Sequence, residues 1–332
     1  FPAMDAALKS DLSLTFLSIL FEGVPFILLG TLLSGFIDVY LPGRTIERLL
    51  PKNPILAVLF SGALGLIIPV CECTTVPVMR RLIRKGLPVS CAVVYMLAAP
   101  AINPVSLFNT YKAFIRPDPM FVVGSRFLLT FGVTVFLGWL LLALKPQHFL
   151  RPRLLTDVMT ASSKGWFGDK DDTTSDDSEP DHGATPQEGG RIITAMRVSV
   201  RDFLETFLFF TIGVLLTAAL KESNLSQALE ELAQTPGLAT PVLMIFAFVS
   251  SLCSTTDALI IAQYNFAYGP KLGFLVFGPM VDIKLIFLYL TIFRGWFVAA
   301  LSIFLFLVIW ALTWNWTSWT WDTYLDIKAL FS

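Results

Sequence analysis

The chain has 332 residues, of which 55% are hydrophobic and only 15% are charged, and its formal net charge is −1. A hydrophobic share this high with so few charges lies outside the range of soluble globular domains, so we expect an all-α polytopic membrane protein with the lipid bilayer as its surroundings. The near-neutral balance excludes a strongly basic surface, and nucleic acid is not expected as a partner.

Apolar segments of about 20 residues, the length that crosses a bilayer, predict eight transmembrane helices in two groups of four. They cover residues 12–37, 54–79, 88–111, 120–144, 200–220, 239–263, 270–292 and 295–316. Residues 146–199, between the groups, include DKDDTTSDDSEPDHGATPQEGG, a composition typical of a disordered linker. The expected units are a first transmembrane repeat at 1–145, a linker at 146–199 and a second transmembrane repeat at 200–332.

The positive charges predict the orientation in the membrane. The loop RRLIRKG at residues 80–86 and the basic residues at both linker ends fall on one side, whereas the loop at 221–238 is acidic. Because basic loops stay cytoplasmic, both termini and the linker are expected in the cytoplasm, with the chain in the plasma (inner) membrane. The first apolar run is long enough to span and no basic segment precedes it, so it is expected to be a transmembrane helix rather than a cleaved signal.

Short matches at a nearly constant offset indicate an internal repeat. Glu22 and Gly30 correspond to Glu205 and Gly213 at a spacing of 183, CTT at 73–75 to STT at 254–256 at 181, and AAPAIN at 98–103 to FGPMVD at 277–282 at 179. With four spans in each half, the simplest geometry is a parallel repeat about an axis along the membrane normal, whereas re-entrant motif segments would make the halves inverted.

Polar or proline-containing stretches interrupt four of the predicted spans. They are PVCECTTVP in the second span, AAPAINP in the third, SSLCSTTDA in the sixth and FGPMVD in the seventh. Breaks in spanning helices are tolerated where they are buried in protein or face water, and paired breaks in two halves mark the midplane site of a transporter. We therefore expect the four breaks to face one another around a hydrated cavity at the repeat interface.

Ionisable residues within the spans point to the same region. They are Glu22, Glu72, Glu205, Asp257, Asp282 and Lys284, and each would cost about 2.5–3.5 kcal/mol at a helix centre. Asp282 lies two residues from Lys284 on a different helical face, so Asp257 is the expected partner of Lys284. That pair either fixes helix register or takes part in transport, and Glu22 and Glu205 either cap broken helices or take part as well.

Thiols and hydroxyl groups lie at the same interruptions. Cys71 and Cys73 diverge by roughly 200° on a regular helix but can face one cavity in an unwound segment. Their thiolates, with Cys253 from the other half, would suit a trivalent metalloid or soft metal, or else act as small apolar residues, as expected for Cys91. The other candidate substrate-binding residues either line a polar path or satisfy freed carbonyls; they are Glu72, Thr74, Thr75, Asn103, Ser254, Thr255 and Thr256.

Two long signatures resemble those of the predicted permease family that includes ArsP, an efflux permease for trivalent organoarsenicals. They are PVCECTTVPVMRRLIRKGLP with LAAPAINPVSL, and SSLCSTTDALIIAQ with FLVFGPMVDIKL. Both halves are covered and the linker is not. The family commonly has glycine where this chain has Thr74. The resemblance implies a multi-span permease without an ATPase domain, and arsenical export is the substrate that it suggests.

These observations predict a permease rather than an enzyme, with no cofactor and with a homo-oligomer as a possible assembly. The leading hypothesis is secondary-active efflux of a small thiophilic solute, in which Glu72 and Asp257 carry protons because burial favours the neutral form of a carboxyl group. No GxxxxGK[ST] segment is present, so ATP is not expected to drive this chain. The alternatives are a channel-like conduit for another small solute or ion and a membrane thiol oxidoreductase using Cys71 and Cys73.

Overall fold

A computed structural model describes most of the chain, and all of its regular elements are helices. The described residues are 16–18, 20, 21, 23–25, 27–32, 35, 51, 53–67, 72–84, 86–114, 118–144, 188–222, 238–254, 256–264 and 266–331. Within these ranges there is no β-strand, which confirms the prediction of a helical protein.

The labelled helices fall on either side of the 146–187 segment. The first group comprises α3 (Pro54–Ile67), α4 (Glu72–Arg84), α5 (Val89–Ile102), α6 (Pro104–Ala113) and α7 (Pro119–Leu142). The second group comprises α9 (Glu188–Glu222), α11 (Ala239–Ser250), α12 (Asp257–Gln263), α13 (Tyr268–Phe277), α14 (Ile283–Tyr289) and α15 (Gly295–Phe331). Residues near the N-terminus add helical turns between Phe16 and Leu32.

Three stretches in the described part are long and apolar enough to cross a membrane, namely Val89–Ala113, Pro119–Leu142 and Gly295–Trp314. Of the other predicted spans, 200–220 lies within the single helix α9, 12–37 lies partly outside the described residues, and three are divided. Span 54–79 is divided into α3 and α4, span 239–263 into α11 and α12, and span 270–292 into α13 and α14. The structure therefore supports several membrane-crossing helices, but the count of eight stays a prediction.

The predicted linker is shorter than expected at its C-terminal end. Helix α9 begins at Glu188, so residues 188–199, predicted as part of the linker, are helical. Apolar side chains at Ile193, Met196 and Val200 recur at helical spacing and continue the apolar pattern of the following span. The acidic, Ser- and Gly-rich composition upstream obscured this pattern. Residues 146–187 lie outside the described part of the chain.

The two groups use the same packing scheme. Helix α3 packs on α5 as α11 packs on α13, and α5 packs on α7 as α13 packs on α15. Helix α5 is buried over its whole length, as an all-apolar helix in a bundle should be. Close approach to α5 requires small residues: a Cβ at Gly65 of α3 would lie 2.8 Å from the Cα of Ala99.

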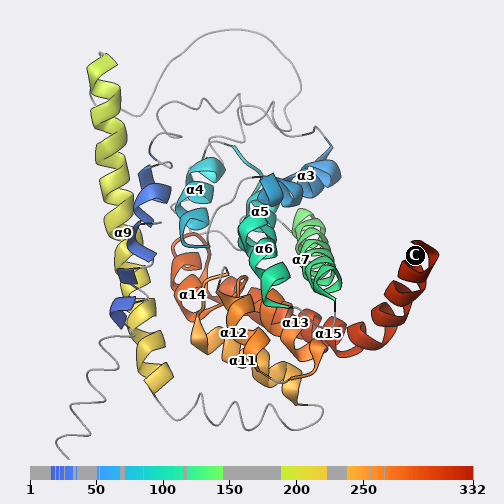
Figure 1. Cartoon of the computed structure of the whole chain (residues 1–332). Helices are drawn as coiled ribbons and strands as arrows, with labels where there is room; N and C mark the ends of the chain where they lie inside the picture. Colours follow the sequence, from blue (N-terminus) through green and yellow to red (C-terminus); the bar gives the residue numbers. More distant parts are fainter. Residues whose placement is uncertain are drawn as a thin grey trace, which may run out of the picture.

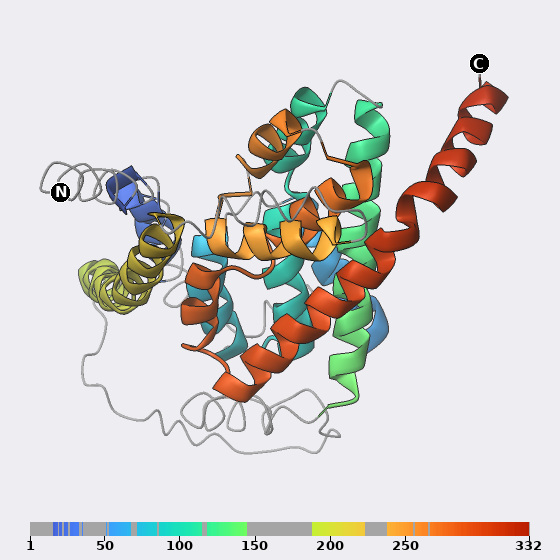
Figure 2. The same cartoon turned by 90° about the horizontal axis from the view of Figure 1, so that it is seen from below.

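Helices from the two groups also pack against each other, with α7 contacting both α13 and α15. Helix α6 packs against α12, and α4 packs against α14; Figure 1 shows these neighbours near the middle of the bundle. The last helices of the two groups, α7 and α15, run in opposite directions in Figure 2. The start of α7 and the start of α15 therefore lie at opposite ends of the bundle (Figure 2).

Large apolar side chains cover the outside of the long helices. On α15, Trp296, Ile303 and Leu307 are 50–60% exposed. On α9, Leu204, Leu208 and other apolar residues are exposed in the same way. Continuous apolar exposure on this scale suits contact with lipid rather than with water, in agreement with the predicted membrane location.

Candidate functional site

The four predicted interruptions lie at helix ends or at breaks between helices, but PVCECTTVP is helical from Glu72 onward and AAPAIN is helical up to Ile102. Helix α3 ends at Ile67 before α4 begins at Glu72, and only Asn103 separates α5 from α6. In the second group, residues 251–256 separate α11 from α12, and residues 278–282 separate α13 from α14. The predicted cause was only partly right, because Pro77 and Pro100 lie inside α4 and α5 instead of ending them.

Side-chain caps define two of these breaks. Asn103 Oδ1 accepts a hydrogen bond from the Ser106 backbone N–H at 2.7 Å and caps α6. Asp282 Oδ1 accepts one from the Leu285 backbone N–H at 2.6 Å and caps α14. Asn and Asp are favoured N-cap residues because they satisfy N–H groups that the first helical turn leaves unpaired. A third break follows Ser251, whose φ of 45° places it in the left-handed region and ends α11.

The first buried ion pair joins α7 to the start of α12. Arg126 Nη2 donates to Asp257 Oδ2 at 2.8 Å, and Nη1 donates to Oδ1 at 3.2 Å. The guanidinium also donates from Nη1 to Thr110 Oγ1 at 2.9 Å and from Nε to the Ala101 carbonyl at 3.2 Å. Arg126 is fully buried. Two parallel N–H···O hydrogen bonds make this the strong, directional form of an arginine–carboxylate ion pair.

The second buried cluster joins α14 to the start of α4. Lys284 Nζ lies 3.3 Å from Glu72 Oε1 and 3.5 Å from Asp282 Oδ2. It also donates to the Ser251 carbonyl at 2.9 Å. The three charged side chains are at most 4% exposed. An ammonium group between two carboxylates keeps both negative charges close together inside the protein.

Ser254 connects the two clusters. Its hydroxyl lies 3.4 Å from Glu72 Oε2, to which it donates. Its carbonyl accepts from Ser106 Oγ at 2.8 Å and, at 3.5 Å, from Arg126 Nη2. The Ser254 carbonyl lies in the break between α11 and α12, and side chains from the first group of helices donate hydrogen bonds to it. We call these side chains the buried polar network; it comprises Glu72, Ser106, Thr110, Arg126, Ser254, Asp257, Asp282 and Lys284.

The predicted pairing of Asp257 with Lys284 is wrong. Asp257 pairs with Arg126, and Lys284 pairs with Glu72 and with its near neighbour Asp282. The helical-face argument against Asp282 failed because Asp282 precedes α14 in an extended conformation, with φ −139° and ψ 174°. Its side chain caps the helix and thereby approaches the first-turn lysine.

The remaining predicted site residues divide into described and undescribed positions. Cys71 and Thr255 lie outside the described residues, as do the side chains of Cys73 and Thr74 and the carboxylates of Glu22 and Glu205. Thr75 is buried, Cys253 is half-buried, and Thr256 Oγ1 donates to the Cys253 carbonyl at 3.1 Å. Thr256 thus satisfies a freed carbonyl, one of the two roles considered for the hydroxyl residues. Among the residues described, no three His, Cys, Asp or Glu groups gather as a metal site.

Sequence reasoning missed Arg126, the central cation of the network. The signal was present, because a single arginine in FVVGSRFLLTFG interrupts a predicted span. An arginine at that depth must find a partner inside the protein.

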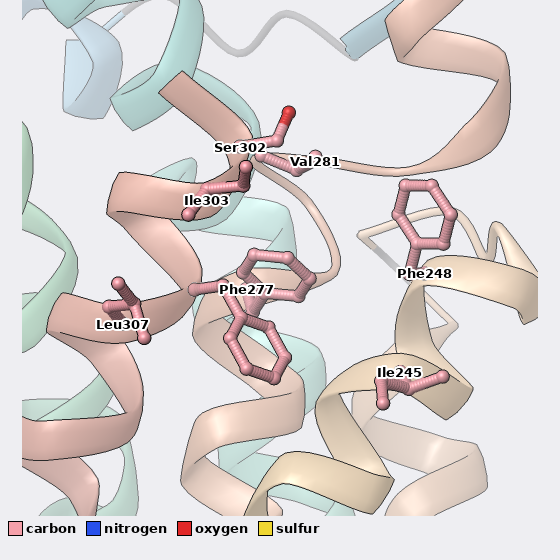
Figure 3. A pocket seen from close by; sticks show the side chains of 8 residues that line it. Ile245, Phe248, Phe277, Val281, Ser302, Ile303 and Leu307 are labelled. Carbon is pink, nitrogen blue, oxygen red and sulfur yellow. The ribbon is translucent and has the colours of Figure 1, made fainter. Parts of the chain in front are cut away.

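An apolar groove of about 250 Å³ opens beside the α13–α14 break. Figure 3 shows its side chains converging from α11, α13, α15 and the break. They are Ile245, Phe248, Phe277, Val281, Ser302, Ile303, Phe306 and Leu307. The charged side chains of the network do not line it. Val281, on its wall, immediately precedes Asp282. Among the described residues, the charged side chains of the network pair with one another, and the hydrated cavity expected around them stays a prediction.

The geometry defines a helical integral membrane protein whose broken helices meet at a buried ion-pair network. Comparisons with known proteins agree with that class. Residues 10–314 match the family ArsP_1, described as "Predicted permease". The chain therefore belongs to this predicted permease family.

Two similar proteins extend this assignment over most of the chain. The UPF0718 protein YcgR of Bacillus subtilis (strain 168) is 34% identical over 306 residues, covering 90% of this chain and 94% of the relative. The "Putative two-component membrane permease complex subunit" of Streptococcus mutans serotype c is 33% identical over 288 residues, covering 85% and 87%. No solved structure is significantly similar. The family and the second relative are described as permeases and not as enzymes, in agreement with the prediction.

Proposed function

We propose that the chain is a secondary-active permease that exports a small thiophilic solute, such as a trivalent organoarsenical, past the four helix breaks. The observation that supports this proposal is that the helix breaks of the two groups lie next to one another. Glu72 of α4 reaches Lys284 of α14, and Arg126 of α7 reaches Asp257 of α12. Paired broken helices at the interface between two halves are the structural mark of a transporter's binding region.

The repeat forms part of this proposal. Helices α3–α7 and α11–α15 share their order, their break positions and several of their packing partners, such as α3–α5 with α11–α13. The caps Asn103 and Asp282 stand at equivalent positions in the two sequences. The opposite directions of α7 and α15 in Figure 2 support the inverted arrangement over the parallel one first favoured from sequence. Inverted halves allow one bundle to rock against the other and expose the site to each side in turn.

The substrate class rests on the thiols at the breaks. Cys71 and Cys73 precede and follow Glu72, whose carboxylate lies in the buried polar network. Cys253 lies beside Ser254, which contacts that same glutamate. Two or three thiols from opposite halves would bind a trivalent metalloid by sulfur, and their release would follow when the halves separate.

The test of the substrate class is resistance in a host sensitive to trivalent methylarsenicals. The double variant Cys71→Ser, Cys73→Ser should lose resistance because a serine hydroxyl is a hard and weak ligand for the metalloid. The matched control is Cys91→Ala, since Cys91 is buried in α5 away from the breaks. Unchanged resistance in the double variant would reject thiol ligation.

Transport itself is tested in everted membrane vesicles. A coupled permease accumulates methylarsenite against its gradient, and a protonophore abolishes the accumulation. A channel-like conduit only equilibrates the solute, so equal concentrations on both sides would reject active export.

Assembly and orientation complete the proposal. The similar Streptococcus mutans protein is named as a subunit of a two-component complex, so this chain is proposed to act with a partner subunit or as a homo-oligomer. Its basic loop at 80–86 and the C-terminal end of α7 are proposed to face the cytoplasm of a plasma (inner) membrane.

A further inference from the structure

We propose that the buried polar network holds one exchangeable proton, and that Asp282 is the residue that carries it. The inference rests on the proposed permease function for the use of that proton, but not for its binding. It departs from the expectation from sequence that Glu72 and Asp257 are the carriers.

The first argument is the charge of the network. Among the side chains that the structure describes, two cations, Arg126 and Lys284, face three carboxyl groups, Glu72, Asp257 and Asp282. Fully ionised, the cluster carries one uncompensated negative charge at a depth where the charged residues are at most 4% exposed. An unpaired buried charge is costly, and binding one proton removes that cost.

The second argument identifies the carboxyl group. Asp257 makes two hydrogen bonds with Arg126, which favour its ionised form. Glu72 accepts from both Lys284 and Ser254. Asp282 differs: its Oδ1 accepts from the backbone of α14, but its buried Oδ2 has no hydrogen-bond partner and lies 3.5 Å from Lys284 Nζ. A proton on Oδ2 removes the negative charge from the carboxyl group that is least stabilised by hydrogen bonds.

The third argument comes from the equivalent position in the other half. The side-chain oxygen of Asn103 accepts from the backbone N–H three residues later and caps α6, as the side-chain oxygen of Asp282 does for α14. The cap therefore needs a side-chain oxygen but no charge. The negative charge of Asp282 is therefore not needed for capping. It is not needed as the counterion of Lys284 either, because Glu72 already has that role.

A metal ion does not fit this place. Lys284 Nζ already lies within 3.5 Å of both carboxylates and repels a further cation. A proton needs no added space. Of the elements packed on α14, α4 presents Glu72, and α9 approaches through Gly213, where a Cβ would lie 2.8 Å from the Lys284 Cα.

The test is infrared spectroscopy of the purified full chain in lipid, titrated with pH in light and heavy water. The wild type should show the carbonyl band of one protonated carboxyl group, sensitive to deuterium, that disappears as pH rises. Asp282→Asn should lose the band while keeping the fold, because asparagine can still cap α14 as it caps α6. Glu72→Gln should move the loss of the band to lower pH, because one carboxylate fewer then competes for Lys284.

The matched control is Asp118→Asn, which changes another aspartate cap, that of α7, outside the network. It should leave the band and its pH midpoint unchanged. Absence of the band in folded wild-type protein, or its persistence in Asp282→Asn, would overturn the proposal. Loss of the band on replacing choline with sodium at constant pH would overturn it too, by showing a metal cation in the same place. None of these results depends on methylarsenite transport, so failure here and failure of the proposed function are distinguishable.

Discussion

The Arg126–Asp257 pair is predicted to be the strongest single link between the two groups of helices. Arg126 is fully buried and donates to Asp257, Thr110, and the Ala101 and Ser254 carbonyls. Removing one partner from a buried pair leaves the other charge uncompensated and costs about 3–5 kcal/mol. Arg126→Met alone and Asp257→Asn alone should each lower the free energy of unfolding by about this amount. The double variant should be less destabilised than the two losses together, by about 2 kcal/mol or more.

The assay is equilibrium unfolding of the full chain in mixed micelles with increasing denaturing detergent. Thr130→Val is the matched control on the same helix, one turn after Arg126. Thr130 Oγ1 is buried without a hydrogen-bond partner, so its replacement should be close to neutral. Strictly additive losses in the double variant would show that Arg126 and Asp257 do not interact as described.

Two further variants test how the helices pack and begin. Gly65→Ala should lower stability by about 1–3 kcal/mol because the new methyl group meets the backbone of Ala99. Gly132→Ala should raise stability by about 0.5–1 kcal/mol, because there is open space around its Cβ. Equal effects of the two variants in thermal denaturation would contradict the α3–α5 contact. Asn103→Ala should cost about 1 kcal/mol through the lost cap of α6, whereas Asn103→Ser should retain most of that stability; if both were neutral, the cap would be unimportant.

The positions of the helix breaks were predictable from sequence because they depend on local chemistry. Asn103 followed by Pro104 is an N-cap followed by a residue that favours the first helical position, and Asp282 is a capping residue. Proline alone was a poorer guide. Pro77 and Pro100 lie within helices, which buried helices tolerate when neighbouring groups satisfy the freed carbonyls.

The pairing of the charges was not predictable from sequence, because it depends on which breaks meet. Lys284 has three carboxyl groups as candidate partners in neighbouring segments, and helical spacing argued against Asp282. The extended backbone at Asp282, set by its role as a cap, brought that side chain to Lys284. Arg126 is a different case: its depth in an apolar span was visible, and a search for every charge in every span would have included it.

Each group of helices supplies the cation of one ion pair and the carboxylate of the other. This arrangement suggests how a proton could drive movement of one group against the other. Arg126, from the first half, meets a carboxylate of the second, whereas Lys284, from the second half, meets a carboxylate of the first. Asp282 belongs to the same half as Lys284. With the proposed proton bound, Glu72 is the counterion of Lys284 among the described residues, and the α4–α14 contact is held. With the proton released, Asp282 neutralises Lys284 within its own half, so Glu72 is no longer required and that contact can open while Arg126 still holds α7 to α12. A ligand shifts a conformational equilibrium only if it binds the two conformations with different affinities. The exchange of counterions at Lys284 would make the affinity for the proton differ between the conformations with the α4–α14 contact closed and open.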